Sequence, residues 1–248
     1  MIKAKLGTFL LNGLIPLRCL VCEGYILQHG MVCAECFKML PFITDPRCRL
    51  CGQPFLSSQQ AGPDSICIEC LEISPSYVIA RAPFCYTGPI PSLIARFKYG
   101  GDLGLAKSLG TYMFKEMQDI LKSSDLLLPV PLHRTRLKKR GYNQALLLAK
   151  VLSRLSQVPY CLQGLERSQN TQSLARKNRA ERYIFLREII HVCKEYEDFL
   201  RLKKHIVIID DILTTGATVE ACIWALQKVT QAKISIATFA RTVDYRLR

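Results

Sequence analysis

The sequence predicts an α/β protein with a parallel sheet and flanking helices, preceded by a small module that binds metal through cysteine. Two stretches predict the sheet, because each combines a buried strand, a polar loop and a helix; they begin at Asp125 and at His205. Four Cys-x-x-Cys pairs near the N-terminus predict the metal-binding module. We therefore expect two domains, with residues 1–74 forming the cysteine module and residues 75–248 forming the α/β domain.

The composition is that of a globular protein with a sizeable core. Of the 248 residues, 49% are hydrophobic, which excludes a disordered chain. No apolar run approaches about 20 residues, so we expect no transmembrane helix. The broken apolar stretch at residues 1–16 lacks a cleavage site and is expected to be a short helix that caps the cysteine module, with peripheral membrane contact as the alternative. The expected location is the cytoplasm.

Positive charge is concentrated in the middle of the chain. The formal net charge is +14, and residues 131–187 contain thirteen Lys or Arg residues against two acids, Glu166 and Glu181, which gives +11 for this segment. Such a concentration attracts polyanions, either a phosphorylated small molecule or the backbone of a nucleic acid. A solvated basic surface without a ligand is the alternative.

The eight paired cysteines have the spacing of two structural zinc sites. One Cys-x-x-Cys turn supplies two thiolates, and a second turn completes a tetrahedral site with no open position for catalysis. Spacing leaves open whether the pairs combine sequentially or in an interleaved order, and a disulfide framework would need an oxidising compartment. In the simpler, sequential assignment the ligands are Cys19, Cys22, Cys33 and Cys36 for one zinc ion and Cys48, Cys51, Cys67 and Cys70 for the other.

Apolar periodicity and the positions of glycine and proline predict the elements of the α/β domain. The expected elements are an extended segment at 77–86, helices at 91–101 and 102–121, a strand at 125–132, a polar loop at 133–143, a helix at 144–155, extended segments at 161–163 and 183–186, a strand at 206–209, a helix at 219–229 and a strand at 232–242. The basic stretch at 167–182 is expected to be a mobile loop that closes over a bound polyanion.

The stretch that begins at His205 has the features of a phosphate-binding turn. Its apolar residues 206–209 predict a strand buried on both faces, and Asp210 and Asp211 follow where this strand is expected to end. Threonines and one glycine then lead into a helix, whose N-terminus attracts anions through free N–H groups and the helix dipole. Two acids would repel a bare phosphate, so the ligand is expected to offer sugar hydroxyls or a divalent metal ion.

Residues 207–218 resemble the phosphoribosyl-pyrophosphate (PRPP) motif of type I phosphoribosyltransferases: a hydrophobic run, two acids, two variable residues and Thr-Thr-Gly-x-Thr. An ordinary buried strand with a Thr-Gly turn is the alternative. The resemblance implies a type I phosphoribosyltransferase-like sheet and PRPP with Mg²⁺ as the ligand. It implies that the catalytic acids Asp210 and Asp211 hold the ribose hydroxyls while residues 214–218 hold the 5-phosphate. The implied PRPP-binding residues are Asp210, Asp211, Ile212, Leu213, Thr214, Thr215, Gly216, Ala217 and Thr218.

The loop at 133–143 is expected to face the PRPP motif, because parallel strands end at the same edge of a sheet. His133, Arg134 and Arg140 in this loop would suit a pyrophosphate, although each is also compatible with an ordinary surface cation.

The chain as a whole resembles the ComF/GntX family, in which a zinc ribbon, often double, precedes a phosphoribosyltransferase-like domain. The matching parts are residues 14–22 with the later cysteine pairs, residues 97–100, residues 129–132 with Arg136 and residues 140–144, the PRPP motif, and residues 240–242. The resemblance adds Lys98 and Arg136 to the expected pyrophosphate residues. It also implies a part in natural transformation, with single-stranded DNA, a competence helicase and a recombination mediator as partners.

Three functions remain in competition at this point. The favoured one is a DNA-uptake factor that binds single-stranded DNA through residues 131–187 and has PRPP as a ligand or cosubstrate. The alternative is an active phosphoribosyltransferase that transfers ribose 5-phosphate to an unknown acceptor, although no base-recognition element is identifiable. The third is a PRPP-sensing regulator that binds duplex DNA on a catalytically silent fold.

Overall fold

A computed structural model describes residues 17–26, 32–56, 65–169 and 179–243. The expected N-terminal helix and most of the expected mobile loop lie outside these residues. The helices are α2 (Ala34–Lys38), α3 (Ile68–Glu72), α4 (Ile90–Tyr99), α5 (Leu105–Glu116), α6 (Gln118–Lys122), α7 (Arg134–Arg140), α8 (Gln144–Ser156), α9 (Arg179–Ile189), α10 (Glu197–Arg201) and α11 (Ala217–Gln227), with a 3-10 turn at Lys194–Tyr196. The strands are β1 (Ala80–Arg81), β2 (Phe84–Cys85), β3 (Leu126–Pro129), β4 (Leu165–Arg167), β5 (Ile190–Val192), β6 (His205–Leu213) and β7 (Lys233–Arg241).

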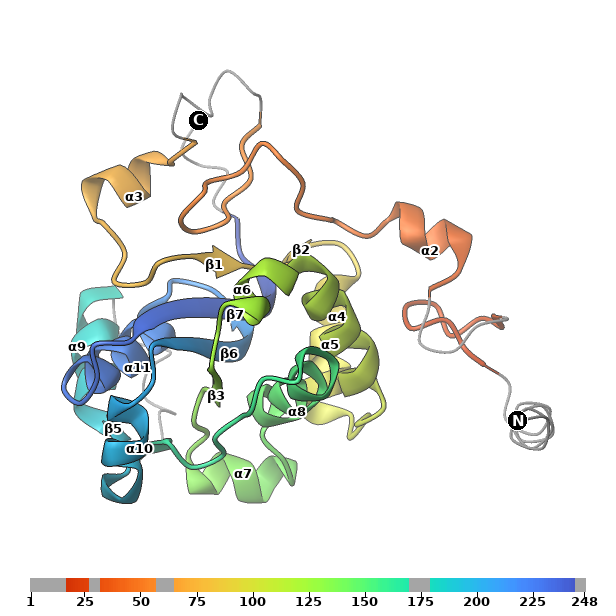
Figure 1. Ribbon diagram of the computed structural model, residues 1–248. Coiled ribbons are helices and arrows are strands. Elements are labelled where there is room, and N and C mark those ends of the chain that lie inside the picture. The colour runs from red at the N-terminus through yellow and green to blue at the C-terminus, as the bar shows by residue number, and fades with distance from the viewer. Residues whose placement is uncertain (1–16, 27–31, 57–64, 170–178, 244–248) are drawn as a thin grey trace.

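A parallel sheet in the order β1–β7–β6–β3 forms the centre of the molecule, and β2 pairs with β7 after β1 (Figure 1). The register of the two long strands runs from His205 opposite Lys233 to Leu213 opposite Arg241. Strands β4 and β5 form a separate antiparallel pair. The predicted α/β fold with a parallel sheet is therefore confirmed.

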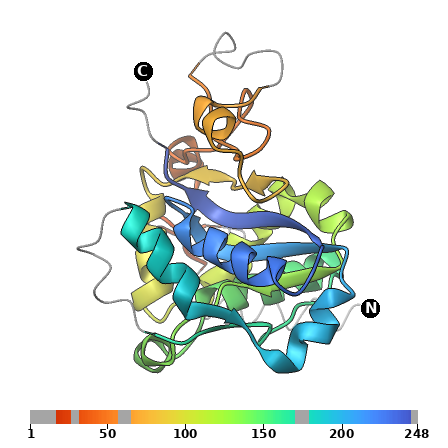
Figure 2. The same ribbon diagram turned by 90° about the vertical axis from the view of Figure 1, so that its left-hand side faces the viewer.

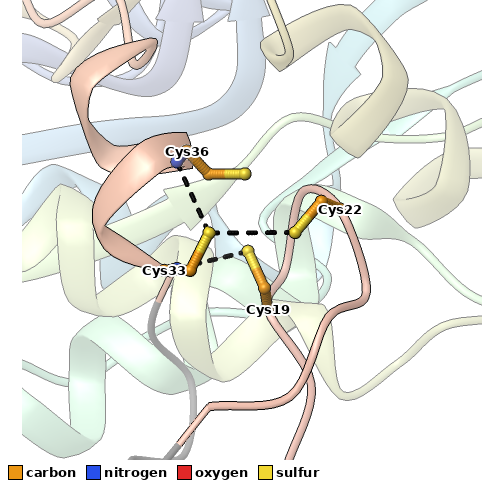
Figure 3. Close-up of side chains that lie close together, drawn as sticks. All are labelled: Cys19, Cys22, Cys33 and Cys36. Atoms are coloured by element: carbon orange, nitrogen blue, oxygen red, sulfur yellow. Dashed lines mark hydrogen bonds between the residues drawn. The ribbon is translucent and has the colours of Figure 1, made fainter.

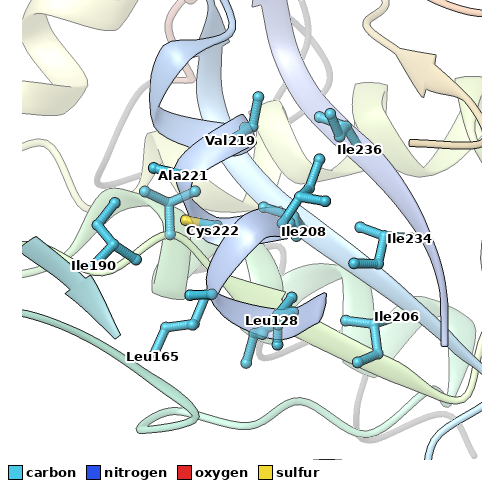
Figure 4. Packing of buried hydrophobic residues seen from close by; sticks show 14 of the residues in the cluster. Leu128, Leu165, Ile190, Ile206, Ile208, Val219, Ala221, Cys222, Ile234 and Ile236 are labelled. Carbon is cyan, nitrogen blue, oxygen red and sulfur yellow. The ribbon is translucent and has the colours of Figure 1, made fainter. Parts of the chain in front are cut away.

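Helices cover both faces of this sheet, which explains why its strands are continuously apolar. Ile206 and Ile208 of β6 point into a buried cluster with α9 and α11, which lie in front of the sheet in Figure 2. Figure 4 shows the packing of this cluster, to which α11 contributes Val219, Ala221 and Cys222. Val207 and Ile209 point into the opposite cluster, with α4, α5 and α8. None of the described helices is long and apolar enough to cross a membrane.

Five expected elements differ from the structure. β6 continues through Asp210 and Asp211 to Leu213, because β7 offers backbone partners along the same length. The expected loop at 133–143 contains helix α7, which buries no residue and therefore shows no apolar periodicity. The expected extended segment at 183–186 is part of α9, and the helix expected at 102–121 is divided into α5 and α6. The extended segment expected at 161–163 occurs slightly later, as β4.

Candidate functional site

The eight paired cysteines gather into two clusters of four, in the sequential order. The first cluster contains Cys19, Cys22, Cys33 and Cys36, and the second contains Cys48, Cys51, Cys67 and Cys70. Within each cluster the four Sγ atoms lie within 4.8 Å of one another. Figure 3 shows the first four thiols converging at the N-terminus of α2. This arrangement rules out the interleaved order, and no disulfide joins these cysteines, which are free.

The sulfur positions fit tetrahedral zinc. Around one zinc ion with Zn–S bonds of about 2.3 Å, the sulfur atoms would lie about 3.8 Å apart. The Sγ atoms of Cys22 and Cys33 are 3.8 Å apart, and those of Cys51 and Cys67 are 3.6 Å apart. The backbone N–H of Cys67 donates to the Sγ of Cys48 at 3.4 Å, which stabilises a thiolate. The residues therefore fit two structural zinc ions, each with a closed set of four ligands.

The turn after β6 has the geometry of an anion-binding turn. Thr214 and Thr215 are exposed, and Gly216 has a left-handed φ of +78°, which glycine adopts readily. No described atom lies within 4 Å of where a Cβ on Gly216 would stand, so the turn faces open space. Gly216 supplies no side-chain cap, and the first N–H groups of α11 have no partner within the helix. These groups are available to an anion.

Asp211 forms an ion pair with Lys98 on the neighbouring helix α4. The distance from Lys98 Nζ to Asp211 Oδ2 is 2.9 Å, and the two side chains are 21% and 7% exposed. The hydroxyl of Tyr142 donates to the carbonyl oxygen of Phe97 at 2.6 Å, which fixes this end of α4 against the segment before α8. The structure thus brings Lys98, an expected pyrophosphate residue, directly to one of the two acids.

Asp210 lies on the other face of β6, because neighbouring strand residues point in opposite directions. Burial and the Asp211 carboxylate raise the pKa of Asp210 to about 7. Lys98, the Asp211 N–H and Arg167 act in the opposite direction and favour the ionised form. The Asp211 N–H donates to Asp210 Oδ1 at 2.8 Å. Asp210 is therefore an acid that changes its charge near neutral pH.

The free energy of unfolding is expected to fall between about pH 4 and about pH 7 because of Asp210. In this range the folded protein keeps the proton that an unfolded chain, with an aspartate pKa of about 3.9, has already lost. The unfolded state then binds fewer protons, so a rising pH favours unfolding. Urea unfolding at several pH values should show this slope in the wild type and a smaller one in Asp210→Asn. An equal slope in both proteins would contradict the raised pKa.

The segment that leaves β3 passes beside the two acids. The backbone N–H of Val130 donates to the carbonyl oxygen of Ile209, the residue before Asp210, at 2.9 Å. His133 caps the start of α7 through its Nδ1. Arg134 and Arg136 lie on α7, which places them in the segment after β3 and not within the sheet.

Arg140 is fixed at the far end of α7 by two side chains. Its guanidinium lies 4.8 Å from the ring centroid of Tyr99 and donates to the Tyr99 hydroxyl at 3.1 Å, one residue after Lys98. It also donates to Gln144 Oε1 at 2.8 Å. Gln144 is buried, and its Nε2 has no hydrogen-bond partner among the described residues.

Sequence reasoning missed Arg167 as a neighbour of the site. Arg167 ends β4 and acts on the charge of Asp210 from the α11 side of the sheet. One signal for Arg167 was present in the sequence, namely its position at the start of the basic stretch. The antiparallel pairing that places Arg167 opposite Ile190 could not be predicted from periodicity.

Comparison with known proteins finds two domain models that match this chain. A double zinc ribbon domain model matches residues 10–85, and a phosphoribosyl transferase domain model matches residues 139–248. The fold is therefore a phosphoribosyltransferase-like parallel sheet with helices, preceded by a double zinc ribbon.

Curated relatives match over nearly their whole length. Competence protein F of Haemophilus influenzae is 27% identical over 231 residues, covering 90% of this chain and 96% of that protein. Competence protein ComFC of Bacillus subtilis is 28% identical over 251 residues, covering 93% and 98%. DNA utilization protein YhgH of Escherichia coli is 26% identical over 241 residues, covering 92% and 99%. Together with the two domain models, these full-length similarities show that the chain belongs to the ComF family.

Proposed function

We propose that this protein is a competence-type factor of DNA uptake in the cytoplasm that binds PRPP with Mg²⁺ at the turn between β6 and α11. One observation carries the proposal: two acids at the end of a buried strand lie directly before an open, glycine-capped helix N-terminus. The names of the full-length relatives, which include competence and DNA utilization proteins, support the cellular role.

In this proposal each part of the site meets one part of PRPP. Residues 214–218 receive the 5-phosphate through backbone N–H groups and threonine hydroxyls. Asp210 and Asp211 accept hydrogen bonds from the ribose hydroxyls. Lys98 and His133, with the cations of α7, face the pyrophosphate, while Mg²⁺, when bound, neutralises the charge between phosphate and carboxylate.

Calorimetric titration of Mg–PRPP into the zinc-loaded full chain tests this site. We expect saturable binding by the wild type and a loss of about 100-fold or more in Asp210→Asn/Asp211→Asn, since each hydrogen bond to a charged group contributes about 1.5–3 kcal/mol. Asp119→Asn/Asp198→Asn removes two exposed acids elsewhere and should bind like the wild type.

Absence of binding by the wild type, or equal binding by both double variants, would refute the PRPP site. Release of pyrophosphate in the same samples would favour the alternative function, phosphoribosyl transfer to an acceptor, and binding without release would favour a ligand role.

We further propose that α7 contributes to binding of single-stranded DNA, which a competence helicase and a recombination mediator would deliver and accept. Five of its seven residues are Lys or Arg, it contains no acid, and it buries no residue. Because phosphate contacts release counterions, Lys138→Gln/Lys139→Gln is expected to weaken binding and to reduce the slope of log affinity against log salt by about 1.4. Lys107→Gln/Lys115→Gln, on the exposed side of α5, is the control. Binding that is indifferent to salt and to α7 would contradict this proposal.

A further inference from the structure

The second zinc cluster is fastened to the edge of the parallel sheet by the turn between its first two cysteines. All three backbone carbonyl groups of residues 49–51 accept hydrogen bonds from sheet residues. The bonds run from Arg81 Nη2 to Arg49 O at 3.0 Å, from the Ala80 N–H to Leu50 O at 2.7 Å, and from Arg241 Nη1 to Cys51 O. A Cβ on Gly52 would lie 2.8 Å from the carbonyl oxygen of Ala80, so the turn and β1 are in close contact. Figure 1 shows this orange segment beside β1 and β7.

Arg241 connects this turn to the strand that carries the two acids. Its side chain is buried, and it is the last residue of β7. In the sheet it lies opposite Leu213, the last residue of β6, and the next residue, Thr242, donates its N–H to the Leu213 carbonyl at 2.9 Å. Thr214 follows immediately in the chain. Arg241 thus connects a zinc ligand, Cys51, to the start of the phosphate turn, which we define as residues 214–216.

Arg241 is a buried cation whose positive charge is not compensated by a carboxylate in the described part of the chain. No carboxylate forms an ion pair with Arg241 among the described residues, although a buried guanidinium needs hydrogen-bonded or charged partners. Four thiolates around a divalent zinc ion carry a net charge of about −2. The zinc-loaded second cluster would therefore provide both the acceptor for Arg241, the Cys51 carbonyl, and the compensating charge.

The first cluster is attached to a different element, helix α4. Arg96 of α4 donates to the carbonyl oxygen of Leu20 at 2.8 Å, and it pairs with Glu23 at 3.4 Å and with Asp102 at 2.9 Å. Its side chain is 32% exposed, in contrast to the buried Arg241. Among the described arginines that donate to a zinc-binding turn, only Arg241 lies at the end of the β6–β7 pair.

We propose that Arg241 is a positioning residue through which zinc in the second cluster holds the phosphate turn, residues 214–216, in place. A turn with almost no core of its own folds around its metal ion, so loss of zinc frees the Cys51 carbonyl. The Nη1 of Arg241 then loses its acceptor while its Nε keeps the Thr242 carbonyl, and the ends of β6 and β7 are no longer bonded to the zinc-binding turn. The effect of this coupling on ligand binding rests on the proposed PRPP site. The coupling between zinc in the second cluster and the order of residues 214–216 does not itself require PRPP.

Hydrogen exchange in the full chain, measured by mass spectrometry, tests the coupling without PRPP. Arg241→Met, with its zinc content verified, is expected to exchange at least about tenfold faster over residues 210–218 than the wild type. Arg96→Met is the matched control and should leave this peptide unchanged, and Arg241→Lys should restore part of the protection. Cys67→Ser/Cys70→Ser should reproduce the effect of Arg241→Met, whereas Cys33→Ser/Cys36→Ser should not.

Equal exchange over residues 210–218 in Arg241→Met, Arg96→Met and the wild type would overturn the proposal. Arg241→Met keeps this test decisive even where the cysteine variants fail to fold.

Release of zinc to a coloured chelator provides a second readout, because linkage between two sites is reciprocal. In Cys33→Ser/Cys36→Ser, which retains only the second cluster, Mg–PRPP should raise the equilibrium affinity for zinc, measured by competition with the chelator, by the factor by which zinc in this cluster raises PRPP affinity. Arg241→Met introduced into this background should remove this gain in zinc affinity. PRPP binding without a gain in zinc affinity would overturn the inference, whereas absence of PRPP binding by the wild type would refute the proposed function and leave the exchange experiment to decide the coupling.

Discussion

Removal of zinc from both clusters is expected to unfold residues 17–72 while the parallel sheet remains folded. Among the described residues of this region, the buried apolar residues other than cysteines are Leu40 and Ile43, so the thiols themselves form most of its core. Structural zinc sites contribute about 10–16 kcal/mol of apparent binding free energy in small peptides at neutral pH, which is as large as the stability of a whole domain. The zinc ribbon therefore has no comparable source of stability without metal.

Limited proteolysis with and without a strong chelator measures this effect. The expected product is a resistant C-terminal fragment that begins shortly after α3, and added zinc should restore resistance of the whole chain. The experiment also tests the predicted division between residues 1–74 and residues 75–248. A ribbon that resists the protease after mass spectrometry has shown the loss of both zinc ions would contradict the prediction.

Lys98→Met is expected to lower the free energy of unfolding by about 3 kcal/mol. The substitution leaves Asp211, whose side chain is 7% exposed, as a buried carboxylate without its cation. Breaking a buried ion pair by removing one partner costs about 3–5 kcal/mol, and the partial exposure of Lys98 places this pair at the lower end.

A double-mutant cycle measured by urea unfolding isolates this ion pair. Asp211→Asn added to Lys98→Met should recover most of the lost stability, because no unpaired charge then remains in the core. Lys107→Met, on the exposed side of α5, is the matched control and should change the unfolding free energy by less than about 0.5 kcal/mol. If Lys98→Met proves as harmless as Lys107→Met, the ion pair does not stabilise the protein.

The parts of the fold that could be predicted are those with strong local signals. Cysteine spacing predicted both clusters, and the apolar runs predicted the two central strands because both of their faces are buried. The end of β6 was misplaced because Asp210 and Asp211 interrupt the apolar run, while the hydrogen-bond ladder with β7 continues past them. Helix α7 was missed because it buries no residue and therefore has no apolar side.

The candidate site was predictable where its residues adjoin one another in sequence and not where they come from distant segments. The PRPP motif lies within one dozen residues, so resemblance alone located it. The pairing of Lys98 with Asp211 depends on how α4 packs against β6, across more than a hundred residues of chain. The contact between Arg241 and Cys51 spans a still longer separation, and neither residue carries a local signal of the other.

The position of β7 has a consequence for how the protein is made. β7 is the last strand among the described residues, yet it lies inside the sheet, between β6 and the early strands β1 and β2. Until β7 has been synthesised and has left the ribosome, the apolar edge of β6 has no neighbour on that side. The core therefore stays incomplete until β7 emerges, and a product truncated before Lys233 would expose an unpaired strand edge that favours aggregation or capture by chaperones.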